Sequence, residues 1–338
     1  MAFEINYFKG SPTGEVFPAK SQRPALKGDE IFIEITHSGV CGTDEHYKFV
    51  DMGLGHEGVG VVKAVGPDVK AFKIGDRAGW GYVHEVCNVC SHCIAGDWIY
   101  CTNNKKMYGV GNSDQGSFGS GAVWKEPYLF HIPDSMASED AAPLMCAGIT
   151  TWAPLTQFGL KATDVVGVVG IGGLGHLAVQ FARALGCEVV ALSGSEEKKE
   201  EALKLGAHHF VATKGVDELT VPRKINHLLI TTSKMPDWNQ YSSILAPMAS
   251  IYPMTVTDFE TKLEVPFMKF LLSGWKLIGS TVPPKVVYVQ MLEFAALHGI
   301  KPVIEKFPLN HEGVVESLKK LDEGKMRYRA VLFADLAH

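Results

Sequence analysis

The pattern of hydrophobic and polar positions differs between the first 150 residues and the rest of the chain. In the first part, short apolar runs at 31–35, 58–65 and 72–78 are separated by turn residues such as the pair Gly66-Pro67. Short strands with frequent glycine and proline between them are typical of a compact, barrel-like β-domain. We therefore predict a β-rich domain over residues 1–150.

From about residue 160 the chain alternates buried apolar runs with amphipathic helical segments. Residues 164–169 and 187–192 predict parallel strands, and residues 176–186 between them predict a helix. The pattern continues with strands at 225–230, 248–252 and 276–281, a helix at 286–297 and a last strand at 330–333. Such alternation predicts a doubly wound parallel sheet of the Rossmann type. We place this domain of α/β class at residues 151–285 and expect residues 286–338 to return to the first domain.

A glycine-rich turn lies between the first strand and the first helix of this second domain. Its sequence is Gly170-Ile171-Gly172-Gly173-Leu174-Gly175. A GxGxxG pattern between a strand and a helix, with a second strand after it, is the context that dinucleotide binding requires. The glycines allow a tight turn and let the backbone approach a pyrophosphate at the helix N-terminus. We predict cofactor contacts from Gly170, Gly172, Gly173, Leu174 and Gly175.

The end of the second strand bears on the choice between the two nicotinamide cofactors. NAD sites usually carry an acidic residue there, which accepts hydrogen bonds from the ribose hydroxyls. This chain has Ser193, and Ser195 and Lys198 that follow can donate to a 2′-phosphate. Ser195 can equally be the N-cap of a helix over 196–205, and two glutamates follow it directly. We predict NADP, with NAD as the alternative.

Four of the seven cysteines lie close together in the first domain. Cys87, Cys90 and Cys93 are each separated by two residues, and Cys101 follows eight positions later. Four thiolates at such spacing close a tetrahedral zinc site that is full and therefore structural. The alternative is four free thiols in an exposed loop. The small number of cysteines argues against a disulfide scaffold and for a reducing compartment.

A second set of zinc-ligand residue types is spread over the first domain. Cys41, the pair His56 and Glu57, and Cys146 offer two thiolates, an imidazole and a carboxylate. Such a set can bind a zinc ion that keeps one position open for chemistry. Because isolated Cys and His residues are often buried fillers, the set alone does not decide between the two interpretations.

Composition and charge narrow the class of protein. The chain has 338 residues, of which 46% are hydrophobic and 20% charged, and a net charge of −5. This gives no electrostatic reason to expect a nucleic-acid partner or an anionic membrane. The apolar stretch 165–182 holds five glycines, which favours a strand, turn and helix over a membrane span. The N-terminus lacks the features of a signal peptide, so we expect a cytoplasmic protein.

Together these motifs resemble the zinc-dependent alcohol dehydrogenases of the medium-chain dehydrogenase/reductase superfamily. The similarity runs the length of the chain and is closest to the cinnamyl-alcohol-dehydrogenase-like branch, on the segments AAPLMCAGIT at 141–150 and GKMRYR at 324–329. The resemblance implies a GroES-like catalytic domain, a Rossmann domain inserted within it and an active-site cleft between them. It also implies a homo-oligomer, a dimer or a tetramer.

The resemblance assigns roles to individual residues. It implies a catalytic zinc bound by Cys41, His56, Glu57 and Cys146, in addition to the structural zinc, and thus two zinc ions per chain. Further roles follow by motif: Asp44 orients His56, Thr43 and His46 relay the proton through the nicotinamide ribose, and Thr150 contacts the nicotinamide end.

The expected function is a zinc-dependent transfer of hydride between NADP(H) and an alcohol/aldehyde pair, with aldehyde reduction as the direction in the cell. Three alternatives stay open: an NAD-dependent alcohol dehydrogenase, a biosynthetic reductase of iminium or conjugated double bonds, and a non-catalytic NADPH-binding protein. The interval from Cys41 to His56 is shorter than is usual in the family, with residues 49–54 in place of a longer loop, which can change the specificity. The substrate itself is not predicted.

Overall fold

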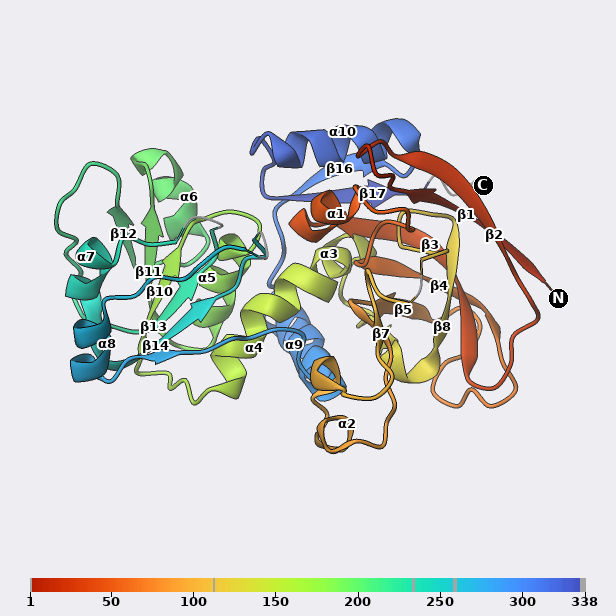
Figure 1. Cartoon of the computed structure of the whole chain (residues 1–338), viewed down its shortest axis with the longest axis horizontal. Coiled ribbons are helices and arrows are strands. Elements are labelled where there is room, and N and C mark those ends of the chain that lie inside the picture. The colour runs from red at the N-terminus through yellow and green to blue at the C-terminus, as the bar shows by residue number, and fades with distance from the viewer. Residues whose placement is uncertain (1, 112, 233–234, 258–259, 335–338) are drawn as a thin grey trace. The chain divides into compact units, whose positions relative to one another are not determined.

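The computed structural model describes residues 2–334 apart from 112, 233–234 and 258–259 (Figure 1). The chain forms two compact units, one of residues 1–149 and 282–338 and one of residues 150–281. None of the helices in the described ranges is both long enough and apolar enough to cross a membrane.

The first unit is built on a seven-stranded sheet. The strand order is β16-β17-β3-β4-β5-β9, and β8 pairs with residues 30–34 of β3 on the edge of β3 opposite β4. Most neighbours are antiparallel; only β16 and β17 run parallel. The helix α10 packs over β16 and β17 and against α1 (Figure 1). The predicted β-rich domain is therefore confirmed. The strands of this unit are β1 (Phe3–Lys9), β2 (Phe17–Arg23), β3 (Glu30–Val40), β4 (Gly58–Val65), β5 (Arg77–Trp80), β6 (Val83–Glu85), β7 (Lys106–Met107), β8 (Gly121–Lys125), β9 (Phe130–His131), β16 (Ile304–Pro308) and β17 (Arg329–Phe333).

Short helices connect these strands and carry several of the predicted site residues. They are α1 (Gly42–Tyr47), α2 (Ser91–Ala95), η1 (Trp98–Tyr100), η2 (Glu126–Tyr128), α3 (Ser138–Pro143), the π-helical turn η3 (Leu144–Gly148), α9 (Lys285–His298) and α10 (His311–Asp322). The core of the unit includes Trp80 and Trp124, both buried among the isoleucines of β3.

The second unit is a six-stranded parallel sheet. Its strand order is β12-β11-β10-β13-β14-β15, the order of a dinucleotide-binding Rossmann fold. All residues of the central strand β10 are buried, as expected for a parallel strand covered on both faces. The helix α5 packs on β10 and β11, α6 on β12 and α8 on β14 (Figure 1). The predicted parallel sheet is confirmed. Its elements are α4 (Ile149–Gln157), β10 (Val165–Val169), α5 (Gly175–Ala184), β11 (Glu188–Ser193), η4 (Glu196–Lys198), α6 (Lys199–Lys204), β12 (His209–Ala212), β13 (Ile225–Ile230), α7 (Trp238–Tyr241), η5 (Ser242–Ile244), β14 (Leu245–Pro253), α8 (Phe267–Ser273) and β15 (Lys276–Leu277).

Three predicted elements differ from the structure. The strand expected at 72–78 begins only at Arg77, because the Lys73 amide donates to the Asp76 carboxylate at 2.9 Å and Gly75 adopts φ +96°, which makes this segment a turn. The strand expected at 276–281 ends at Leu277, where its pairing with β14 stops. The helix expected over 196–205 is split into η4 and α6.

Candidate functional site

The first group of possible metal ligands forms where β3 and β4 bring distant segments together. Cys41 directly follows β3 and precedes α1, while His56 and Glu57 directly precede β4, the antiparallel neighbour of β3. Cys146 comes from η3. The ligating atoms of these four residues all lie within 4.8 Å of one another.

The chemistry of this group fits a zinc ion. The Sγ atoms of Cys41 and Cys146 are 3.9 Å apart, close to the ~3.8 Å edge of a tetrahedron with Zn–S distances of about 2.3 Å. His56 Nε2 and Glu57 Oε2 are buried and have no hydrogen-bond partner. Buried polar atoms are rarely left unsatisfied, so two unpaired polar atoms beside two thiols favour a bound cation.

Asp44 holds the imidazole of His56 in place. Its Oδ1 accepts a hydrogen bond from His56 Nδ1 at 2.9 Å, and its Oδ2 accepts one from the Cys41 amide at 2.8 Å. Burial alone would lower the pKa of His56, but the Asp44 carboxylate and Cys41 raise it well above the usual value. Because Nδ1 faces the carboxylate, Nε2 is the ring nitrogen available to a metal.

Glu57 has a partner that the sequence did not reveal. The guanidinium of Arg329, at the start of β17, forms a buried ion pair with Glu57 Oε1. Burial raises the pKa of Glu57 to about 7 against the opposing effect of Arg329. Gly39 leaves room for the carboxylate, since a Cβ there would lie 1.9 Å from Glu57 Oε2. Arg329 belongs to the GKMRYR segment, but no local pattern links it to a residue 272 positions away.

The residues predicted for the proton relay and for the nicotinamide contact lie on two helices. On α1, Thr43 is buried and its Oγ1 is 3.7 Å from Cys41 Sγ, whereas His46 is exposed. Thr150 lies in the first turn of α4 and belongs to the second unit. The structure thus places Thr43 beside a predicted zinc ligand and His46 one helical turn further, at the surface.

The four-cysteine group also gathers around one point. The sulfurs of Cys87, Cys90, Cys93 and Cys101 all lie within 4.8 Å of one another, and those of Cys87 and Cys93 are 3.8 Å apart. The Cys90 amide donates to Cys87 Sγ at 3.4 Å. Hydrogen bonds from the amides of Cys93 and Thr102 lower the pKa of Cys90 to about 6. A loop whose amides stabilise thiolates, the form that binds metal, fits a zinc ion closed by four sulfurs.

The glycine turn has the tight geometry that dinucleotide binding needs. Gly170 directly follows β10 with φ +88°, and a Cβ on Gly175 would lie 1.8 Å from the Gly170 carbonyl oxygen, so only glycine fits at position 175. A Cβ on Gly172 would meet nothing within 4 Å, so this position faces open space. Gly173 and Leu174 complete the turn before α5 begins at Gly175. The turn therefore lets a pyrophosphate approach the N-terminus of α5.

The residues predicted to choose the cofactor surround the end of β11. Ser193 is the last residue of β11 and is buried, whereas Ser195 and Lys198 are exposed. Ser195 precedes η4, but its side chain makes no capping hydrogen bond. The alternative role of Ser195 as a helix-capping side chain is therefore not observed. Lys198 Nζ donates to the Ile171 carbonyl at 2.8 Å and thus lies beside the glycine turn.

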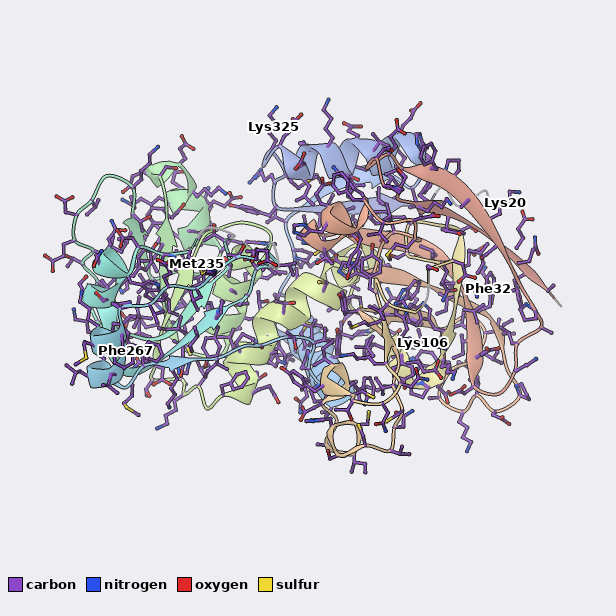
Figure 2. The ribbon with its side chains drawn as sticks, in the orientation of Figure 1. Lys20, Phe32, Lys106, Met235, Phe267 and Lys325 are labelled. Atoms are coloured by element: carbon purple, nitrogen blue, oxygen red, sulfur yellow. The ribbon has the colours of Figure 1, made fainter. Side chains whose placement is uncertain are left out.

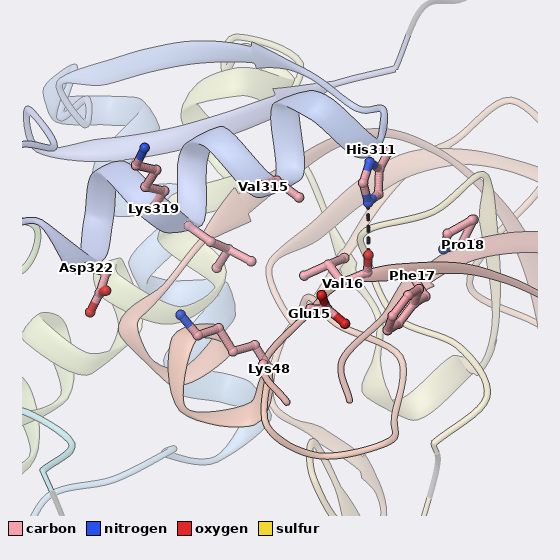
Figure 3. Close-up of a pocket in the computed structure, with 11 residues that line it drawn as sticks. Glu15, Val16, Phe17, Pro18, Lys48, His311, Val315, Lys319 and Asp322 are labelled. Carbon is pink, nitrogen blue, oxygen red and sulfur yellow. Dashed lines mark hydrogen bonds between the residues drawn. The ribbon is translucent and has the colours of Figure 1, made fainter. Parts of the chain in front are cut away.

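A cavity of about 650 Å³ lies elsewhere in the first unit (Figure 3). It is formed by the segment after β1, the end of α1 and the helix α10, and His311 Nε2 donates across it to the Val16 carbonyl at 2.9 Å. Its lining mixes apolar side chains such as Phe17 and Val315 with charged ones. None of the predicted metal, relay or nucleotide residues lines it.

Two family models match the chain. The model described as "Alcohol dehydrogenase GroES-like domain" matches residues 27–134, and the one described as "Zinc-binding dehydrogenase" matches residues 173–297. These matches confirm the expected combination of a GroES-like and a Rossmann domain.

Similar proteins cover almost the whole chain. The aldehyde reductase AdhA of Synechocystis sp. is 34% identical over 327 residues, which cover 94% of this chain and 95% of that protein. The probable cinnamyl alcohol dehydrogenase 8B of Oryza sativa subsp. japonica is 34% identical over 336 residues, 95% of this chain and 76% of that protein.

Solved structures agree with this similarity. CAD from Helicobacter pylori, complexed with NADP(H), has a TM-score of 0.88 at 27% identity and covers 98% of this chain and 99% of its own. The cinnamyl alcohol dehydrogenase SbCAD4 from Sorghum bicolor has a TM-score of 0.87 at 29% identity, with 98% of each chain covered.

Proposed function

Because the chain belongs to the zinc-dependent alcohol dehydrogenases of the medium-chain dehydrogenase/reductase superfamily, in the cinnamyl-alcohol-dehydrogenase-like branch, we propose that it interconverts alcohols and aldehydes with NADP(H). Aldehyde reduction is the proposed direction in the cell, as the name of the Synechocystis relative suggests. We assign catalysis to residues 1–150 with 286–338 and nucleotide binding to residues 151–285.

The observation that carries this proposal is the group Cys41, His56, Glu57 and Cys146, whose ligand atoms lie within 4.8 Å of one another and include two buried polar atoms without a hydrogen-bond partner. We propose it as the catalytic zinc site and the four-cysteine loop as a second, structural one. Zinc in such a site supplies Lewis acidity toward a substrate oxygen, and a bound nicotinamide supplies the hydride. The carboxylate of Glu57 forms an ion pair with Arg329. Of the four proposed ligands, Glu57 can therefore leave the zinc most easily and open a coordination position.

Protein side chains then handle the proton. Thr43 Oγ1, next to the ligand Cys41, is placed to exchange a proton with the substrate oxygen. His46 is exposed on the same helix and exchanges the proton with solvent. The role of Thr150 is to contact the nicotinamide end of the cofactor. A protein that only binds NADPH needs neither the relay nor the ligand group.

NADP is the proposed cofactor because the end of β11 carries no acid. Ser193, which takes the place of the acid, does not repel a 2′-phosphate, and Ser195 and Lys198 offer hydrogen-bond donors beside the glycine turn. The NADP(H) bound to CAD from Helicobacter pylori supports the same choice.

A homo-oligomer is proposed from the exposed apolar surface of the second unit. Four large side chains of α8 are 57–79% exposed, among them Phe267, which projects outward in Figure 2. Met248 of β14 and Leu277 of β15 are also exposed, and within the described part of the chain no strand pairs with the outer edge of β15. Contiguous exposed apolar residues beside an open sheet edge are typical of protein interfaces.

A cytoplasmic location is proposed from the cysteines. All seven are free thiols, and six of them are among the eight candidate ligands of the two metal groups. Thiolate zinc sites need reduced cysteines, which a reducing compartment maintains.

The test combines metal analysis with a substrate panel. We expect about two zinc ions per chain and reduction of aliphatic, aromatic or allylic aldehydes with NADPH. Cys41→Ser should abolish turnover and keep NADPH binding, whereas Cys187→Ser, a buried thiol outside both groups, should retain activity. Activity that survives complete removal of the catalytic zinc would refute the zinc mechanism. Binding of NADPH without reduction of any aldehyde would favour a binding protein or a reductase of another double bond.

A further inference from the structure

Tyr108 packs directly on the proposed zinc ligand His56. The two rings are stacked, with centroids 4.6 Å apart and an angle of 30° between their planes. Tyr108 is 1% exposed, and two further tyrosines border it, Tyr47 at 5.1 Å and Tyr82 at 6.0 Å between ring centroids. The imidazole therefore has an aromatic ring against its face as well as Asp44 at its Nδ1.

The hydroxyl of Tyr108 contacts the backbone directly before His56. It accepts a hydrogen bond from the amide of Gly55, the residue before His56, at 2.9 Å. Burial, together with the negative charge of Asp44, raises the pKa of Tyr108 well above its usual value, so the hydroxyl that accepts from Gly55 is neutral.

The backbone around Tyr108 is fixed independently of the zinc group. Tyr108 directly follows β7, which pairs with β6, and its amide donates to the Tyr82 carbonyl at 2.8 Å. The next residue, Gly109, adopts φ +83°, and a Cβ there would lie 2.2 Å from the Tyr47 ring. The chain between β6 and β7 is the four-cysteine loop, so a metal in that loop would brace the strand pair that carries Tyr108.

We propose that Tyr108 is a positioning residue, which fixes the ring plane of His56 and the backbone at Gly55 so that His56 Nε2 points into the ligand group. The proposal rests on the assignment of that group as a zinc site. A ring stacked at 4.6 Å prevents the imidazole from tilting, and the hydroxyl holds the Gly55 amide, directly before His56. Groups that orient metal ligands typically change the metal affinity about 10- to 100-fold when they are removed.

The test measures zinc affinity by competition with a chelator, in the full-length protein without cofactor or substrate. Tyr108→Phe keeps the stacked ring and loses only the hydroxyl, while Tyr108→Leu loses both. We expect the affinity of the catalytic site to fall about tenfold in Tyr108→Phe and further in Tyr108→Leu, with the four-cysteine zinc retained. The d–d absorption of protein loaded with Co²⁺ should shift in both variants, because it reports the ligand geometry.

A matched control is Tyr128→Phe. Tyr128 is also buried, and its hydroxyl also accepts from a backbone amide, that of Val86 at 3.0 Å, but it packs with the four-cysteine loop and is not part of the group of Cys41, His56, Glu57 and Cys146. Tyr128→Phe should lower the stability of the protein without changing the zinc affinity or the Co²⁺ spectrum of the catalytic site. Wild-type affinity and Co²⁺ spectrum in Tyr108→Phe, or equal loss of both zinc ions, would overturn the positioning role. If the wild-type protein itself binds zinc only at the cysteine loop, the proposed function fails as well.

Discussion

Replacing Lys198 with alanine should weaken the use of NADPH selectively. Lys198 ends η4, and its ammonium is held 2.8 Å from the Ile171 carbonyl of the glycine turn. It therefore lies between the turn that we propose for the pyrophosphate and the end of β11, where Ser193 replaces the acid of NAD sites. A 2′-phosphate at this position would replace the neutral Ile171 carbonyl with a charged acceptor for the Lys198 ammonium.

The size of the effect follows from that exchange. A hydrogen bond to a charged group contributes about 1.5–3 kcal/mol, roughly twice a neutral one. Lys198 is exposed and already has the carbonyl as a partner, so the net gain lies at the lower end. A loss of about 1–2 kcal/mol corresponds to a fall of about 5- to 30-fold in kcat/KM for NADPH. NADH lacks the phosphate, so its kcat/KM should change less than about twofold.

The assay compares kcat/KM for NADPH and NADH with one aldehyde at fixed ionic strength. Lys199→Ala is the matched control, because it removes the same charge from the next position, where the ammonium pairs with Glu196 at 3.1 Å. Equal losses with both cofactors in Lys198→Ala would mean that this lysine only supports the turn through Ile171. Equal losses in the two variants would mean that general charge, and not a placed donor, attracts NADPH.

Three other results are expected. Cys93→Ser should lower the zinc content from about two ions per chain to about one and reduce the melting temperature, as metal analysis and calorimetry can show. Gly175→Ala should destabilise the cofactor-free protein by about 1–3 kcal/mol, because its Cβ would lie 1.8 Å from the Gly170 oxygen, whereas Gly172→Ala should fold normally. Burial lowers the pKa of His84 to about 3. Below pH ~6.5 this histidine is therefore protonated in the unfolded state but stays neutral in the folded state. Stability should fall by about 2 kcal/mol more between pH 7 and pH 5 in the wild type than in His84→Phe, and identical pH dependence in denaturant titrations would contradict this.

Local features of the sequence determined most of the architecture. Strands such as 225–230 were predicted with the observed bounds, because a buried parallel strand is a continuous apolar run between turns. The four cysteines at 87–101 and the glycine turn at 170–175 are compact motifs, so their spacing contains the geometry. The grouping of Cys41, His56, Glu57 and Cys146 needed the family resemblance as well, since no local rule connects three separate segments.

Only the tertiary structure decided which side chains support those residues. Arg329 meets Glu57 across 272 positions, and Tyr108 reaches His56 from beyond the cysteine loop. Ion pairs and ring contacts of this kind arise from the pairing of strands that are distant in sequence, and neither periodicity nor spacing records them. The same holds for the bounds of β5 and β15, because pairing with neighbouring strands ends a strand as much as its own composition does.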